Sequence, residues 1–149
     1  MNPWSFIAAG FGAGLAPKAP GTCGSLLGLI IGYLLLGLGG HAALVVGIIV
    51  STLLGTYAIG QLPEATEDPG WIVIDEIAGQ MLPLLALIHV TLWGALVAFL
   101  LFRLFDILKP GPVGWADKRK DAYGIMADDL IAGALALLVM IILYRLLHL

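Results

Sequence analysis

Three long stretches without a charged side chain constrain this fold more than any other feature of the sequence. They cover residues 19–63, 77–102 and 130–144. A straight helix needs about 20 apolar residues to cross a hydrocarbon layer about 30 Å thick, and the first two stretches exceed this length. Apolar residues make up 60% of the 149-residue chain and charged residues 11%, so a soluble fold would lack the polar surface to cover its core. The sequence therefore predicts an integral membrane protein.

The balance of charge and cysteine excludes several other classes. Seven Lys and Arg residues stand against ten Asp and Glu residues, so the chain offers no basic face for nucleic acid. A single cysteine, Cys23, excludes a disulfide framework and a cysteine-rich metal site. At this length we expect one membrane-embedded domain over residues 1–149.

The first charge-free stretch contains a turn signal, Gly39-Gly40-His41, inside apolar sequence. It predicts a hairpin of two helices over residues 25–38 and 42–61. A separate short helix is predicted at the N-terminus, with Asn2 as its N-cap and Pro3 as its first residue. One helical stripe continues along it through Trp4, Ile7, Phe11 and Leu15, which suits a helix at the membrane interface or one that dips into the bilayer. A helix simply packed in the bundle is an equal alternative.

The second charge-free stretch admits two interpretations. Residues 75–103 form either one long span or two shorter helices, 75–88 and 92–108, folded at residues 88–91. The single span puts Asp75 and Asp106 on opposite membrane faces, whereas the hairpin returns both to the same face. We favour the hairpin because it brings these polar residues together, although its first helix rises only about 21 Å.

The expected fold is an all-α, polytopic membrane helix bundle. It has about five membrane helices, some of them short and in hairpins, plus the N-terminal interfacial or re-entrant helix; four full spans are the alternative. With five helices, Lys18 shares one membrane face with segments 64–76 and 103–129. The positive-inside rule makes this face cytoplasmic, because it carries Lys109, Lys118, Arg119 and Lys120.

A segment rich in glycine and proline, residues 10–25, precedes the first long helix. Glycines allow backbone N–H groups to approach a phosphate, and a helix beginning at Ser25 would offer free donors. Lys18 adds positive charge, and the hydroxyls of Thr22 and Ser25 can donate hydrogen bonds. The pattern predicts a phosphate-binding segment, while an ordinary turn with Ser25 as N-cap is the simpler alternative.

Carboxylates gather on the same membrane face as this segment. Asp75-Glu76 and Asp128-Asp129 are each interpreted as the opening of a helix, where acids suit the helix dipole. One Asp of each pair begins the same pattern, Asp75-Glu-Ile-Ala-Gly79 and Asp129-Leu-Ile-Ala-Gly133, in which a glycine one turn later lets helices approach closely. Clustered carboxylates without cysteine or convergent histidine suit Mg²⁺. The predicted ligands are Asp75, Glu76, Asp106, Asp128 and Asp129.

Two cations complete the predicted site. Arg103 and Lys109 lie on the helical face of Asp106, where they are expected to hold a phosphate, although a salt-bridged helix end is the simpler interpretation of Arg103. Cations beside a metal suit the hydrolysis of a phosphate ester. No Ser-His or Cys-His pair is available, so we expect direct attack by water, with a transient aspartyl-phosphate as the alternative. The predicted catalytic residues are Asp75, Asp106, Asp129 and Lys109.

Several motifs follow one another in a specific order and spacing from Asn2 to Gly133. They are Asn2-Pro-Trp4, Gly10-Phe-Gly-x-Gly, Pro20-Gly-Thr-x-Gly-Ser25, Asp68-Pro69, Asp75-Glu76-x-x-Gly79, Phe102-Arg103-x-x-Asp106-x-x-Lys109-Pro110-x-Pro112, Asp117 and Gly124-Ile-Met-x-Asp128-Asp129-x-x-Ala-Gly133. Taken together, these motifs resemble the phosphatidylglycerophosphatase A family, a group of bacterial membrane lipid phosphatases, over nearly the whole chain.

The resemblance implies Mg²⁺-dependent hydrolysis of phosphatidylglycerol phosphate to phosphatidylglycerol and inorganic phosphate. It also implies the bacterial cytoplasmic membrane, with the active site facing the cytoplasm and membrane lipids around the chain. Another lipid phosphomonoester, such as phosphatidate, is the alternative substrate. A non-enzymatic lipid-phosphate carrier is the alternative of a different class, although a carrier has no need of five converging carboxylates.

Overall fold

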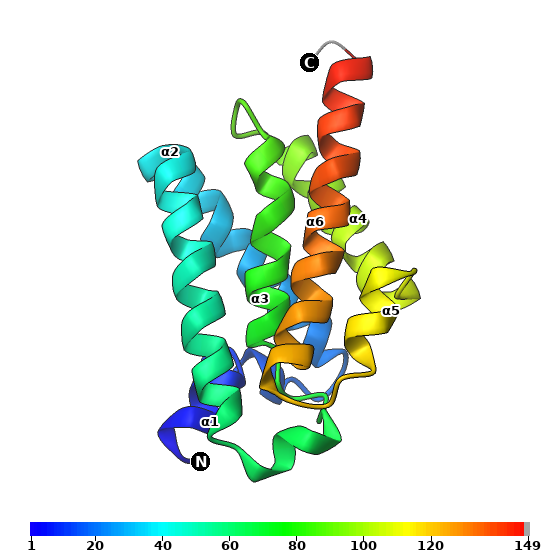
Figure 1. Cartoon of the computed structure of the whole chain (residues 1–149). Coiled ribbons are helices and arrows are strands. Elements are labelled where there is room, and N and C mark those ends of the chain that lie inside the picture. Colours follow the sequence, from blue (N-terminus) through cyan, green and yellow to red (C-terminus); the bar gives the residue numbers. More distant parts are fainter. Residues whose placement is uncertain (148–149) are drawn as a thin grey trace.

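The computed structural model of the chain describes residues 1–147 and consists of helices joined by short loops (Figure 1). Its α-helices are α1 (Pro3–Ala8), α2 (Pro20–Gly60), α3 (Ile74–Met81), α4 (Leu92–Leu108), α5 (Pro112–Asp117) and α6 (Ala122–Leu146). Three short 3₁₀ turns lie between them, namely η1 (Ala13–Leu15), η2 (Pro63–Glu67) and η3 (Leu82–Ala86). The all-α class predicted from the sequence is confirmed.

The helix α2 is folded back on itself at Gly40, which has a left-handed φ of 67°. Its two arms lie against each other, because a Cβ at Gly32 would lie 3.5 Å from Leu44 Cδ1. Residues twelve apart in a straight helix would be separated by about 18 Å. The hairpin predicted at Gly39-Gly40-His41 is therefore confirmed. Its first arm begins at Pro20, however, and not at Ser25 as expected, since proline is pre-set for the first helical turn.

The second charge-free stretch forms two antiparallel elements, as Figure 1 shows. The first is α3 with its continuation η3, in which Pro83 cannot extend the α-helical hydrogen bonding. The chain turns over residues 87–91, and the side chain of Thr91 accepts a hydrogen bond from Gly94 N (3.1 Å) to cap α4. The hairpin interpretation is confirmed, and the single continuous span is wrong.

Two helices in the described residues, α2 and α6, are long and apolar enough to cross a membrane. The helices of the second hairpin are shorter, with 8 residues in α3 and 17 in α4. Large apolar side chains are exposed on the outer faces of α2, α4 and α6, as expected for surfaces that meet lipid. The length and composition of α2 and α6 thus favour membrane association, while the count of five membrane helices does not follow from length.

The N-terminal helix is shorter than its apolar stripe suggested. It begins with Asn2 Oδ1 accepting from Ser5 N (2.8 Å), as predicted, but it ends at Ala8. Residues 10–12 then adopt left-handed φ values, which removes Phe11 from the helix and leaves its side chain exposed. The helix is tied to the bundle, because Ala8 O accepts from Val73 N (2.9 Å).

The start of α6 also differs from expectation. The helix begins at Ala122, and Asp121 caps it by accepting from Gly124 N (2.8 Å). Asp128 and Asp129 therefore lie about two turns inside α6 and do not open a helix as predicted. Because Asp121 satisfies a free N–H group at the first turn, the helix begins there and not at Asp128.

Candidate active site

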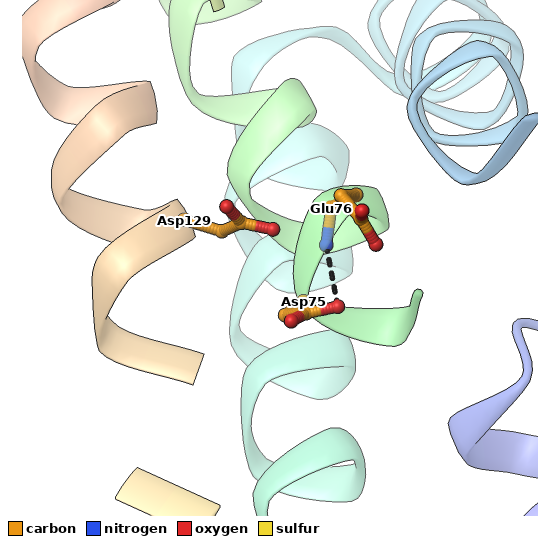
Figure 2. A group of neighbouring side chains, drawn as sticks. All are labelled: Asp75, Glu76 and Asp129. Atoms are coloured by element: carbon orange, nitrogen blue, oxygen red, sulfur yellow. Dashed lines mark hydrogen bonds between the residues drawn. The ribbon is translucent and has the colours of Figure 1, made fainter. Parts of the chain in front are cut away.

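Three carboxylates meet between α3 and α6. Asp75, Glu76 and Asp129 each offer one oxygen, and these oxygens lie within 4.8 Å of one another. Figure 2 shows Asp129 reaching from α6 toward the first turn of α3, which carries the other two. Asp75 and Asp129 are 7% and 3% exposed. We call these three residues the carboxylate triad.

Local backbone structure places the triad. Asp75 and Glu76 occupy the first turn of α3, where the positive end of the helix dipole stabilises them. Asp75 Oδ1 accepts from Glu76 N (3.0 Å), so the carboxylate satisfies an N–H group that the helix itself cannot. The same local contact recurs in α6, where Asp128 Oδ1 accepts from Asp129 N (2.9 Å).

The third member of the triad reaches the other two because α3 and α6 touch through glycine. A Cβ at Gly79 would lie 2.5 Å from the carbonyl oxygen of Asp129, and a Cβ at Gly133 would collide with the carbonyl oxygen of Gly79. The helices can approach this closely only without side chains at both positions. The inference drawn from the matching Asp-x-x-x-Gly patterns is confirmed.

An arginine from α4 lies beside the triad. Arg103 pairs with Asp106 one turn later, and its Nη1 donates to Ser25 Oγ (3.2 Å). Ser25 Oγ in turn donates to Gly21 O (2.9 Å). A Cβ at Gly21 would touch Glu76 Oε1 and would lie 3.6 Å from Arg103 Nη1, so the start of α2 adjoins both the triad and the arginine.

Asp106 and Asp128 lie next to the triad without belonging to it. The charge of Asp106 acts on both Glu76 and Asp129, but its carboxylate is held by Arg103. Asp128 is held by Lys109 (2.7 Å). The structure therefore gathers three of the five predicted ligands directly and pairs the other two with cations.

Lys109 connects several segments through ion pairs. Its Nζ lies 2.6 Å from Asp117 Oδ1 and 2.7 Å from Asp128 Oδ2. Lys120 continues the chain of charges, because it contacts Asp117 (3.7 Å) and Asp68 (3.3 Å). We call these five residues the Lys109 network. It joins the end of α4 to α5, to α6 and to the loop after η2.

The Lys109 network changes the pKa values of Lys109 and Asp117, which both lie outside the two helices that could span a membrane. Burial disfavours the charged ammonium of Lys109, but its hydrogen bonds to Asp117 and Asp128 outweigh this and raise its pKa above the usual range. The hydrogen bond from Lys109 lowers the pKa of Asp117. Lys109 is therefore positively charged and Asp117 negatively charged at neutral pH.

The predicted phosphate-binding segment lies at the same end of the molecule. Gly10 to Gly12 form a left-handed turn, Lys18 is exposed, and no ion pair within residues 1–147 involves Lys18. Thr22 is half-buried in the first turn of α2, whose first N–H groups have no intrahelical acceptors. Ser25 is buried one turn further on and bound to Arg103, so it is not the helix N-cap.

Two residues near the site were not predicted as functional. Asp117 was noted in a motif but not as a partner of Lys109, because the two are brought together by the turn at Pro110 and Pro112. Gln80 lies fully buried on α3, one turn after Glu76. Its signal was available in the sequence, since it is an isolated amide in an apolar helix.

The triad fits a hard divalent cation. Its donors are all carboxylate oxygens, which Mg²⁺ prefers, and no thiol or imidazole belongs to it. Glu76 Oε2 is buried and has no hydrogen-bond partner in the described part of the chain. Three carboxylates packed this closely repel one another, and a cation between them would remove that repulsion.

A cavity at the other end of the bundle does not compete with the triad as a catalytic site. It lies between α4 and α6, has a volume of about 430 Å³ and is lined mainly by apolar side chains. His89, Thr91 and Tyr144 are its polar lining residues, and no carboxylate lines it in the described structure.

Comparison with known proteins links this geometry to lipid phosphatases. Residues 6–144 match the model of the phosphatidylglycerophosphatase A family. A phosphatidylglycerophosphatase A of Haemophilus influenzae is 40% identical over 142 residues, covering 93% of this chain and 87% of the relative. That of Escherichia coli is 36% identical over 138 residues, covering 91% and 80%.

A third relative carries a different substrate in its name. This Bacteroides thetaiotaomicron protein, provisionally named phosphatidylinositol-3-phosphatase, is 40% identical over 134 residues, covering 85% of this chain and 84% of the relative. No solved structure matches the chain.

Proposed function

The chain belongs to the phosphatidylglycerophosphatase A family, and we propose that it uses Mg²⁺, held by the carboxylate triad, to hydrolyse phosphatidylglycerol phosphate. It is a phosphatidylglycerophosphatase, a phosphomonoester hydrolase of phospholipid metabolism. The products are phosphatidylglycerol and inorganic phosphate. Membership in an enzyme family sets aside the alternative of a lipid-phosphate carrier. The observation that carries the metal proposal is the close approach of the buried Asp75 and Asp129 and the half-buried Glu76, whose oxygens lie within 4.8 Å of one another.

Residues of the chain would divide the work as follows. Asp75, Glu76 and Asp129 would hold the cation, with Asp106 and Asp128 as neighbouring acids that add to the negative field. A bound Mg²⁺ would neutralise charge on the phosphate oxygens and favour deprotonation of an attacking water. Direct attack by water remains our proposal, with an aspartyl-phosphate intermediate as its alternative.

The substrate phosphate would be held at the start of α2. We propose that Arg103 donates to it, assisted by Lys18, Thr22 and Ser25 and by the free N–H groups of the first helical turn. The proximity of Gly21 to both Glu76 and Arg103 supports this, because it places that turn beside the triad. The N-terminus of a helix suits an anion, because its free N–H groups and the positive end of the helix dipole point toward it.

Lys109 is proposed as a second phosphate ligand, which would exchange one carboxylate partner for the substrate. Replacing it by Met is expected to lower kcat/KM by about 10²-fold, the loss typical of one preorganised donor. Phosphate release from the lipid substrate measures this change. Asp117→Asn is the matched variant, because it removes one ion pair and leaves the ammonium in place. It should retain activity within a few-fold, and an equal loss in both variants would assign Lys109 a structural role.

The distribution of charge supports a proposal for the position of the chain in the membrane. We propose a single membrane-embedded domain with about five membrane helices, in which the triad end faces the cytoplasm of a bacterial cell. Lys109, Lys118, Arg119 and Lys120 all lie at this end, which the positive-inside rule assigns to the cytoplasm. The lipid tails would lie against the apolar helix faces, with the headgroup at the triad.

The decisive experiment measures phosphate release by purified protein in mixed micelles. Phosphatidylglycerol phosphate is expected to be hydrolysed with Mg²⁺, to be spared in excess EDTA, and to be hydrolysed again when Mg²⁺ is restored. Its water-soluble headgroup alone should react more slowly, because it lacks the contacts of the lipid tails. Undiminished hydrolysis in EDTA would contradict the metal proposal.

The same assay tests a second candidate substrate. The Bacteroides relative favours including phosphatidylinositol 3-phosphate beside phosphatidate in the comparison. We expect the highest kcat/KM with phosphatidylglycerol phosphate. Faster hydrolysis of phosphatidylinositol 3-phosphate would instead assign the chain to the activity named for that relative.

A further inference from the structure

One buried polar side chain has no role in the site described so far. Gln80 is 0% exposed, and neither its amide nitrogen nor its amide oxygen has a hydrogen-bond partner within residues 1–147. A buried amide without a partner is costly, and in an apolar helix it calls for an explanation. A second orphaned atom lies on the same helix, since Glu76 Oε2 is buried and equally unpartnered.

The two side chains share one face of α3. Residues four apart in a helix are neighbours on its surface, which puts Gln80 directly beyond Glu76. Both face the first arm of α2. A Cβ at Gly21 would touch Glu76 Oε1, and a Cβ at Gly28 would lie 3.2 Å from Gln80 Cβ. Gly21 and Gly28 are two helical turns apart, so they also lie on one face.

Glycine in α2 allows the turn of α3 that carries Gln80 to pack closely against it. A Cβ at Gly28 would approach the carbonyl oxygen of Ile77 to 2.7 Å, so no larger residue fits opposite this turn of α3. Ile77 and Met81, which are close to Gln80 along α3, are apolar and buried. Glu76 lies four residues before Gln80 on the same helix, and its Oε2 is a buried acceptor without a partner within residues 1–147.

We propose that Gln80 is a positioning residue for Glu76: in the cation-bound protein its amide Nε2 donates to Glu76 Oε2 and holds the carboxylate in place for the cation. The inference rests on the metal site proposed above and extends it by one residue. Their four-residue spacing puts both side chains on one helix face, where such a hydrogen bond can form. A carboxylate ligand fixed by such a donor binds its metal more tightly.

The proposal separates metal affinity from folding stability. Met has nearly the shape of Gln but no amide, so Gln80→Met removes the donor and keeps the packing. Replacing an orphaned buried polar group by an apolar one of the same shape is close to neutral for stability. The expected result is a thermal unfolding temperature of the metal-free protein that is unchanged or higher.

The experiment is titration of the purified, detergent-solubilised protein with Mn²⁺, followed by electron paramagnetic resonance. Gln80→Met should raise the Kd for Mn²⁺ by about 10- to 100-fold, as expected for loss of a group that orients a ligand. Gln80→Asn withdraws the donor by one methylene and should also weaken binding, which keeps the test available if Gln80→Met folds poorly. Met81→Leu is the matched control for a buried change on the next residue, and its Kd should match the wild type.

Each outcome is decisive. An unchanged Kd in both Gln80 variants, with Mn²⁺ bound by the wild type, overturns the role of Gln80 and leaves the metal site intact. A lower unfolding temperature of the metal-free variants with an unchanged Kd identifies Gln80 as structural. If the wild type itself binds no Mn²⁺, the metal site proposed above is wrong and this inference falls with it.

Discussion

Replacing Asp129 by Asn is expected to abolish phosphate release while the protein remains folded. The variant loses a charged oxygen of the carboxylate triad, and with it the cation that we propose to neutralise the phosphate. Losing several kcal/mol of charge stabilisation in the transition state corresponds to a fall in kcat of about 10³-fold or more. Initial rates with phosphatidylglycerol phosphate at saturating Mg²⁺ measure this loss.

Folding should not suffer in this variant. Asp129 is 3% exposed and lies beside the charges of Asp75, Asp106 and Asp128, so its removal relieves repulsion in the metal-free protein. The thermal unfolding temperature in EDTA is expected to equal or exceed that of the wild type. Loss of activity together with loss of the folded state would instead make Asp129 a structural residue.

A matched control lies on the same helix. Asp121→Asn makes the same chemical change at the N-cap of α6, where Asn caps as well as Asp does. We expect this variant to keep both its activity and its stability. Near-normal activity in Asp129→Asn, measured beside this control, would remove Asp129 from the site.

Adding one methyl group at Gly133 is expected to be almost as damaging. A Cβ there would collide with the carbonyl oxygen of Gly79, so Gly133→Ala must push α6 away from α3. Overpacking of this kind costs about 1–3 kcal/mol of folding free energy. Because the triad spans these two helices, a displacement of about 1 Å should also lower kcat/KM by about 10²-fold.

Gly37→Ala provides the control for the loss of a helical glycine. It lies in the first arm of α2, and a Cβ there would meet nothing within 4 Å. Alanine is favoured over glycine inside a helix, so this variant should be as stable as the wild type or slightly more stable. Thermal unfolding and phosphate release are measured for both variants. Full activity in Gly133→Ala would mean that the close approach of α3 and α6 is not needed for catalysis.

Local patterns in the sequence determined where the chain turns and which residues were candidates for the site. Gly39-Gly40 is a turn signal inside apolar sequence, and the polar residues around His89 allowed the second hairpin. The glycines at 79 and 133 predicted a close helix contact, since a missing side chain has a direct steric meaning. Family membership also followed from ordered motifs, and the comparisons confirm it.

Helix ends were predicted less well, because several residues in a row could serve as the boundary. Pro20 begins α2 five residues before Ser25, and Asp121 caps α6 well before Asp128. Each error had a consequence for function. Ser25 became a partner of Arg103 instead of a helix cap, and Asp128 and Asp129 became side chains of a helix interior.

Tertiary structure alone decided which acids meet. Asp128 and Asp129 are adjacent, but neighbours on a helix point about 100° apart, so one faces Lys109 and the other faces Asp75. That choice depends on how α6 is rotated in the bundle, which packing against α3 sets through Gly79 and Gly133. A sequence states the residue types and their spacing, whereas the rotation of one helix against another follows from contacts between segments far apart in the chain.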